Sequence, residues 1–380
     1  MTGQLRDLLE ERADAVGFRP PDLAEIVAEG DRRVRRRRLR AVTAAAVVTA
    51  VVGGGAVVAG AIRHPDEVVT GGGLADAVTW SRGSTIHVGP DEIDVGFLIH
   101  GFLRTSSGFV LMDGQQSVWS VTDAGQRRIG KVGGQERLVA DRNGTLAAWI
   151  DPADELVVFD QLAGTTRSFG DLAGTSDGGG VLALDGRTVY WRSGAGVVTV
   201  NADTGKVTPF ADGRLQLFDV KNSVLAFADA TRDLKVGSSL EDAKPIVAWS
   251  LDTHGGDEPV VLSPTGRWVA VAHIRVTGSG DSQEIESRLN VYDVRTHAAT
   301  ALHLPGGRWV AVPSVWLGDA TLQVMGLFGN PPFTGDTIDP SLFSCSLPSG
   351  SCRRVATVGK VGAGYAIATL PDGHWSSDDQ

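Results

Sequence analysis

Three residue types in this 380-residue chain could do chemistry: a serine in a glycine-rich string, eight histidines and two cysteines. The string GTSDG at residues 174–178 matches the G-x-S-x-G pattern, which presents a nucleophilic serine at a sharp turn between a strand and a helix. Here the string opens a glycine-rich stretch and no helical pattern follows it. We therefore expect a loop at this position and no serine nucleophile.

The histidines and acidic residues form no metal-binding or catalytic pattern. The histidines are dispersed and show neither H-x-H nor H-E-x-x-H spacing. His100 and His273 are the two that strand patterns would let face a central channel, although we expect a core or surface position for each. Acidic groups within residues 151–160 and 281–286 lack the ordered D-x-D-x-D-G series of a calcium loop. The sequence therefore predicts no metal, no cofactor and no catalytic residue.

The two cysteines, Cys345 and Cys352, are separated by the turn-forming residues SLPSGS. A hairpin would place the two thiols opposite each other. A zinc site needs more ligands than two sulfurs, and the nearest histidines in sequence, His297 and His303, have no ligand spacing. We therefore expect a disulfide that staples a local hairpin, which is allowed outside a bacterial cytoplasm.

The chain changes character at residues 32–62. Arg32–Arg40 reads RRVRRRRLR, with seven arginines in nine residues, and the next 22 residues, Ala41–Ile62, carry no charge. A helix of that length, at about 1.5 Å per residue, is about 33 Å long and could cross a hydrocarbon core of about 30 Å. Arginine-rich flanks stay in the cytoplasm, so we expect a single-pass protein of the cell membrane with an extracytoplasmic C-terminal domain.

The charge distribution follows the same border. Residues 1–64 contain 11 basic and eight acidic residues, and residues 65–380 contain 24 basic and 37 acidic residues, which gives formal charges of +3 and −13. An acidic external domain does not attract nucleic acid. The arginine block is explained by the membrane beside it and by contact with anionic lipid.

The alternative to a retained anchor is a cleavable signal peptide, because Ala59-Gly60-Ala61 has the A-x-A form of a cleavage site. The 40-residue leader and the long apolar run favour a transmembrane helix at residues 41–62. Residues 1–40 show two short amphipathic helical patterns separated by Pro20-Pro21. This cytoplasmic head either sets the topology or docks on a cytoplasmic partner through residues 1–30.

After a linker at residues 63–74, the hydrophobic pattern changes to period two. One unit recurs: two apolar runs around a polar turn, followed by an alternating hairpin, which together make a four-stranded sheet. Clear first halves are LVADRNGTLAAWI, VLALDGRTVYWRS and VLSPTGRWVAVAH, beginning at Leu138, Val181 and Val261. Four-stranded units of roughly 40 to 50 residues indicate the blades of a β-propeller.

Six units fit between Phe97 and Val358, one of them degenerate. Of the fragments left over, Asp76–Gly89 reads as the outer hairpin of a blade and Gly364–Leu370 as an inner strand. Joining them would form a seventh blade from both chain ends and close the ring.

We therefore expect an all-β propeller at residues 75–370, with seven blades favoured over six or eight, and a flexible tail at residues 371–380. A β-sandwich or an irregular solenoid of short strands is the alternative fold.

A family resemblance lies in the turns of these units. LSPTGRWVA at Leu262–Ala270 resembles the SPDG-[KR]-x-[ILV]-A signature of TolB-like and WD-repeat-like propeller blades, with Thr265 in place of Asp. LDGRTV at Leu184–Val189 is a looser copy, and VYDV at Val291–Val294 resembles the strand before the family's next turn. The arginine-rich leader, single anchor and external propeller together resemble membrane-anchored proteins of the actinobacterial type. Such a resemblance implies fold and not function.

Two inserts, Thr277–Ser287 and Gly326–Ser341, extend the last two units and are candidate binding surfaces. The second contains three prolines and could present an apolar contact through four side chains: Leu327, Phe328, Phe333 and Ile338.

The leading hypothesis for function is a membrane-anchored extracytoplasmic propeller that binds a protein, peptide or envelope glycan without catalysis. One alternative is an envelope hydrolase or lyase that uses channel-lining acids or His100. The other is a transmembrane sensor that signals through the cytoplasmic head. Acids and histidines that converge on the channel would favour the enzyme.

Overall fold

The computed structural model describes residues 77–133, 137–170, 180–193, 196–229, 233–247, 260–277, 284–306, 309–328, 340–358 and 368–370. The cytoplasmic head at 1–40, the anchor at 41–62, the linker at 63–74 and the tail at 371–380 lie outside these residues and stay predictions. Within the described part of the chain, no helix is long and apolar enough to cross a membrane.

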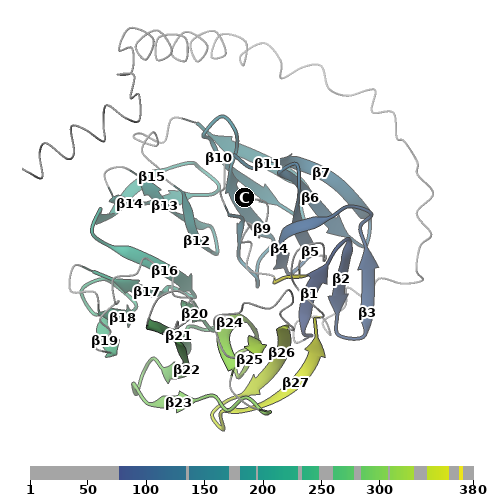
Figure 1. Cartoon of the computed structure of the whole chain (residues 1–380). Coiled ribbons are helices and arrows are strands. Elements are labelled where there is room, and N and C mark those ends of the chain that lie inside the picture. The colour runs from purple at the N-terminus through teal and green to yellow at the C-terminus, as the bar shows by residue number, and fades with distance from the viewer. Residues whose placement is uncertain are drawn as a thin grey trace, which may run out of the picture. The chain divides into compact units, whose positions relative to one another are not determined.

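The described residues form seven four-stranded antiparallel sheets. Figure 1 shows these sheets arranged around a common centre, as the blades of a propeller. The expected all-β propeller with seven blades is therefore confirmed. Each blade is numbered here by its place in the ring, and its strands are given from the inner to the outer edge.

The first four blades use strands from both ends of the chain and from its first half. Blade 1 contains β28 (Ala368–Thr369), β1 (Thr79–Arg82), β2 (Thr85–Val88) and β3 (Asp91–Asp94). Blade 2 contains β4 (Ile99–Thr105), β5 (Gly108–Asp113), β6 (Ser117–Thr122) and β7 (Gly125–Lys131). Blade 3 contains β8 (Val139–Ala140), β9 (Leu146–Ile150), β10 (Leu156–Asp160) and β11 (Thr165–Phe169). Blade 4 contains β12 (Val181–Asp185), β13 (Thr188–Ser193), β14 (Gly196–Asn201) and β15 (Val207–Asp212).

The remaining three blades follow in chain order. Blade 5 contains β16 (Gln216–Lys221), β17 (Val224–Ala228), β18 (Leu234–Gly237) and β19 (Lys244–Val247). Blade 6 contains β20 (Val260–Leu262), β21 (Trp268–Thr277), β22 (Glu284–Asp293) and β23 (Ala299–Ala301). Blade 7 contains β24 (Trp309–Gly318), β25 (Thr321–Phe328), β26 (Pro340–Ser346) and β27 (Ser351–Thr357).

Blade 1 closes the ring by joining the two ends of the propeller. The C-terminal strand β28 is its inner strand and pairs with β1, with Ser81 opposite Thr369 and Arg82 opposite Ala368. The prediction of a shared blade is confirmed, but the assignment of Asp76–Gly89 as its outer hairpin is wrong. β1 and β2 are the two middle strands, and the outermost strand is the acidic β3. Sequence reasoning missed β3 because its DEID sequence lacks a hydrophobic alternation.

Seven apolar clusters, one between each pair of neighbouring blades, form the core. The cluster between blades 3 and 4, for example, combines Ile150 and Val158 with Leu184 and Trp191. Strands in the middle of a blade are buried on both faces because each face packs on a neighbour; all five residues of β9 are buried. This explains why middle strands read as continuous apolar runs, whereas outer strands such as β7 and β11 are mostly exposed.

Two buried glutamines join neighbouring blades. Gln161 Nε2 donates to the carbonyls of Phe109 and Val121 at 2.9 and 3.2 Å, which holds blade 3 against blade 2. Gln323, on β25, is fully buried: its Nε2 donates to the Thr79 carbonyl at 2.9 Å and its Oε1 accepts from the Thr79 amide at 3.0 Å. Gln323 therefore holds the closing blade 1 against blade 7.

Candidate functional site

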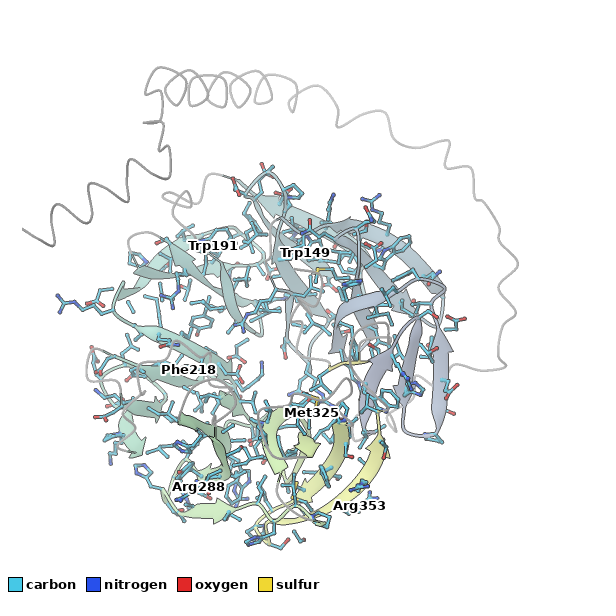
Figure 2. All side chains as sticks on the ribbon, in the orientation of Figure 1. Trp149, Trp191, Phe218, Arg288, Met325 and Arg353 are labelled. Atoms are coloured by element: carbon cyan, nitrogen blue, oxygen red, sulfur yellow. A yellow bond between two sulfur atoms is a disulfide. The ribbon has the colours of Figure 1, made fainter. Side chains whose placement is uncertain are left out.

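The candidate site is a cavity of about 820 Å³ at the centre of the ring. Residues from the inner strand of each blade, or next to it, line the cavity: Arg104, Ala140, Leu184, Leu217, Val261, Val312 and Leu370. Met325, on β25, also lines the cavity and lies toward the centre of the ring, whereas Arg353 lies at the outer edge of the ring (Figure 2). A volume of this size matches ligand-binding pockets of about 300 to 1,000 Å³.

The charged side chains that line the cavity are mostly cationic. Six are basic and two are acidic, a formal excess of four positive charges: Arg104, Arg137, Arg142, Arg192, Arg214 and Lys221, with Asp141 and Asp219. This balance is opposite to the net charge of −13 on residues 65–380. The cavity is therefore a local cationic region inside an acidic module.

Three of the arginines lie at the end of the ring where the inner strands begin, called here the strand-start end. Arg137 is two residues before β8, and Arg214 is two residues before β16. Arg192 is near the end of β13, and its backbone amide donates to Gly180, just before β12. The three residues thus belong to blades 3, 4 and 5, which are consecutive in the ring.

Hydrogen bonds from two of these arginines link the consecutive blades. Arg137 donates from Nη2 to the Leu182 carbonyl, and Arg192 donates from Nη2 to the Leu215 carbonyl at 3.4 Å. Arg214 precedes Leu215 and its side chain is exposed. The strand-start end therefore holds an arc of guanidinium groups along one side of the cavity.

The opposite end of the cavity lies beside the turns between the first and second strands of the blades and is called the turn end. Arg142, in the turn after β8, donates to the Trp316 carbonyl on β24. Blades 3 and 7 are not neighbours in the ring, so this side chain extends across the cavity. Arg142 consequently narrows the cavity at the turn end.

Both carboxylates of the lining accept hydrogen bonds from backbone amides. Asp141 accepts from Asn143 and Gly186 at 3.1 and 3.2 Å. Asp219 accepts from Val220 at 2.8 Å and Leu262 at 2.9 Å, and it pairs with Lys221 at 3.5 Å. These contacts give the acids a structural role. They do not form the pair of carboxylates with separate acid and base roles that glycoside hydrolysis needs.

Neither candidate channel histidine lines the cavity. His100, on β4, is 5 % exposed and lies beside Gly114, where an added Cβ would be 2.9 Å from its Nε2. His273 is on β21, the second strand of its blade, where burial lowers its pKa and the charge of Arg288 lowers it further. Both histidines therefore have the core or surface position that we expected, and neither takes the channel position that strand patterns would allow. Strand alternation alone does not show which face of an inner strand points to the axis.

The predicted disulfide between Cys345 and Cys352 is present. The two residues are opposite each other on β26 and β27, and their Cα atoms are 4.0 Å apart. Cys345 is fully buried in the cluster between blades 6 and 7. The bridge is therefore a structural staple within blade 7, distant in the fold from the inner strands.

The two expected inserts are shorter than the sequence indicates. Leu327 and Phe328 belong to β25, with Leu327 opposite Pro340, so this insert is reduced to residues 329–339. Phe333 and Ile338 lie outside the described residues, and an apolar contact there stays a prediction. In the other insert, β21 reaches Thr277 and β22 starts at Glu284. Extended strands account for much of what the sequence assigned to loops.

The remaining motifs are the G-x-S-x-G string and the acidic groups. The GTSDG string at 174–178 lies outside the described residues. Asp151 and Asp160 accept backbone amides in their own turns, from Ala153 at 2.8 Å and Ala163 at 3.2 Å. Among the described residues, no group of three or more His, Cys, Asp or Glu side chains is arranged to hold a metal ion.

Sequence reasoning missed the arginines of the cavity, although two of them share a pattern. Arg137-Leu138 and Arg214-Leu215 each stand directly before an inner strand, and both leucines are buried. An Arg-Leu pair that recurs at the same place in two repeats was a detectable signal. Arg104, Arg142 and Arg192 have no such common position.

Solved propellers resemble the chain in fold. A TolB-type protein from Agrobacterium tumefaciens aligns over 76 % of this chain and 99 % of its own, with 10 % identity and a TM-score of 0.37. BamB from Moraxella catarrhalis aligns over 76 % and 93 %, with 12 % identity and a TM-score of 0.32. The WD40 repeats of RRP9 align over 74 % and 86 %, with 11 % identity and a TM-score of 0.43. A likeness at this level concerns the fold alone.

No protein-family model matches the chain, and no curated protein matches it. The class is therefore given by the architecture: the described residues form a seven-bladed β-propeller.

Proposed function

We propose that the chain is a single-pass membrane protein whose external propeller binds a ligand in its central cavity without catalysis. The observation that carries this proposal is the cavity itself, which residues from all seven blades line and in which guanidinium groups outnumber carboxylates. The ligand class at this level is a protein, a peptide or an envelope glycan, a part of which enters the cavity.

Support for the external location comes from the sequence. The seven arginines at Arg32–Arg40 stand directly before 22 uncharged residues, an order that keeps the N-terminus in the cytoplasm. The disulfide between Cys345 and Cys352 agrees with a compartment that permits disulfides. A reporter fused after Gly73 tests this topology, because a reporter active only outside the cytoplasm should be active there.

The geometry favours binding over the hydrolase alternative. Two carboxylates line the cavity, and backbone amides hold both. General acid catalysis needs a carboxyl group that is available to a substrate proton. An enzyme was expected to have acidic side chains and histidines that converge on the channel. The described residues that line the cavity do not include a histidine.

A photo-crosslinking side chain inside the cavity tests binding in the full chain. Gly213 lines the cavity, and a Cβ added there meets no atom within 4 Å, so Gly213→p-benzoylphenylalanine should be tolerated. Irradiation of intact cells should give a crosslinked species from position 213 and none from Arg353→p-benzoylphenylalanine, whose site is on the outer strand β27. Crosslinking from position 353 alone would contradict binding in the cavity.

A further inference from the structure

We propose that the strand-start end of the cavity is an oxyanion site, in which Arg192 and Arg214 bind a carboxylate or phosphate group of the ligand part that enters the cavity. This inference rests on the proposed function and assigns the chemistry of its ligand. Guanidinium groups match both oxyanions because their planar fork donates two parallel N–H bonds.

The arrangement of the arginines supports a site instead of scattered surface charge. Arg137, Arg192 and Arg214 come from three consecutive blades, and all three line the same cavity. The contact from Arg192 to the Leu215 carbonyl places its guanidinium beside the residue that follows Arg214. A guanidinium has five N–H donors, and a single contact of 3.4 Å engages Arg192 only weakly.

The charge along the rest of the cavity lining also favours an anion. Arg104 lines the cavity and is 8 % exposed, so its charge acts in a region of low dielectric constant. Asp141 and Asp219 are the only carboxylates among the described lining residues. Asp141 is in the turn after β8, and Asp219 accepts from Leu262 at the end of β20, so both lie toward the turn end. An anion that enters at the strand-start end therefore meets guanidinium groups first.

The dimensions and the apolar walls favour an isolated anionic group of the ligand over an extended polyanion. The cavity of about 820 Å³ is narrowed by Arg142 at the turn end, and Leu103, Leu138 and Leu182 supply apolar surface beside the arginines. The net charge of −13 on residues 65–380 repels an extended polyanion such as nucleic acid. The part of the ligand that enters the cavity is therefore expected to carry one or two anionic groups beside a modest apolar surface.

Calorimetric titration of the full chain, purified in a mild detergent, tests the site with sodium phosphate, citrate and the neutral molecule glycerol. We expect heat of binding from phosphate, citrate or both, and none from glycerol. The stronger oxyanion identifies whether phosphate or carboxylate is preferred. Affinity should fall as sodium chloride is raised, because salt screens charge interactions.

Matched variants then locate the binding. Arg192→Gln with Arg214→Gln should raise Kd by about tenfold or more, the effect of losing one or two charge-assisted hydrogen bonds. Arg353→Gln with Arg354→Gln, on the exposed outer strand β27, also removes two positive charges and should leave Kd unchanged. Thermal unfolding of each variant checks that the propeller is folded.

Two outcomes would overturn the oxyanion site: neither anion binds the wild-type chain, or the double variant binds as the wild type does. The photo-crosslink from position 213 separates this failure from that of the proposed function. If the crosslink forms while neither anion binds, the cavity binds a ligand of another chemistry and the proposed function stands.

Discussion

At the scale of single residues, Gln323 joins the closing blade 1 to blade 7 through its two hydrogen bonds to Thr79. Gln323→Leu replaces the polar side chain with an apolar one of similar size and leaves the buried amide and carbonyl of Thr79 without their partner. We expect a loss of about 2 to 3 kcal/mol in the free energy of unfolding, measured by urea denaturation. Gln126→Leu, on the exposed strand β7, is the matched control and should change stability little. Equal free energies of unfolding for the two variants would contradict the role of Gln323 in holding blade 1 against blade 7.

Asp293 links stability to pH. Burial raises its pKa, but hydrogen bonds from Thr296 and Arg295 and the charge of Arg267 lower the pKa by more than burial raises it. A depressed pKa in the folded state stabilises the protein at pH values above the ordinary aspartate pKa of about 3.9. This stability is lost as the pH falls through the folded-state pKa. The free energy of unfolding should therefore fall below about pH 4.

The variant Asp293→Asn isolates this contribution. The amide oxygen can still accept from Arg295 and Thr296 but does not titrate, so the variant should lose less stability between neutral pH and pH 3 than the wild type. Urea denaturation across this range measures the slope. Identical slopes for the two proteins would show that Asp293 does not contribute to it.

Sequence reasoning at the residue scale succeeded where chemistry is local. The spacing of Cys345 and Cys352 and the turn between them were sufficient to predict the disulfide. The binding residues were harder because the cavity brings together Arg137, Arg192 and Arg214 from separate repeats. Each is unremarkable alone, and only the closed ring gives them a common surface.

At the scale of elements, the turns between the first and second strands form a belt at the turn end of the ring. Both carboxylate oxygens of Asp185, in blade 4, accept amides of blade 5, from Asn222 and Ser223 at 2.8 Å each. Between blades 6 and 7 the direction reverses: Thr265 donates its amide and hydroxyl to Asp319. Thr265, at the position where the TolB-like signature has Asp, therefore donates to an acid on the next blade.

The hydrogen bonds of Asp185 should contribute to stability because they hold a turn whose backbone conformation is unfavourable for residues other than glycine. Asn222 and Ser223 have φ angles of 49° and 64°, in the left-handed region that non-glycine residues rarely occupy. Asp185→Ala should lower the free energy of unfolding by about 1 to 2 kcal/mol. Asp123→Ala, in an exposed turn at the rim of blade 2, is the matched control. Denaturation curves that do not distinguish the two variants would rule out this role.

The strands that sequence reasoning predicted best are the middle strands, because burial on both faces makes them continuous apolar runs. LAAWI in β9 and VLAFA in β17 are examples. The outermost strands were predicted less well. Their side chains are mostly exposed, as in β3 and β11, so their sequences lack the hydrophobic pattern that indicates a strand.

At the scale of the whole molecule, the ring closes through a strand of only two residues, β28. Leu370, directly after it, is 8 % exposed and packs in the cluster between blades 7 and 1. Deletion of residues 368–380 should lower the unfolding temperature by about 5 °C or more, since it removes a buried leucine and exposes the edge of β1. Deletion of residues 372–380 leaves the strand in place and should have little effect. Equal unfolding temperatures would show that closure does not depend on β28.

The number of blades was predictable because a propeller repeats one unit, and closure supplied the seventh blade from two fragments. The location of the ligand site was not predictable in the same way. A propeller sequence specifies how each blade packs on its neighbours, whereas the cavity results from the arrangement of all seven blades around one axis.

The central claim is that an anionic ligand group binds at the strand-start end of the cavity. Crystals of the full chain soaked in sodium tungstate, an oxyanion with strong anomalous scattering, test it most directly. We expect an anomalous peak within hydrogen-bond distance of Arg192 and Arg214, and no peak there in the double variant Arg192→Gln with Arg214→Gln. An ordered tungstate found only on the outer strands, with the cavity empty, would contradict the claim.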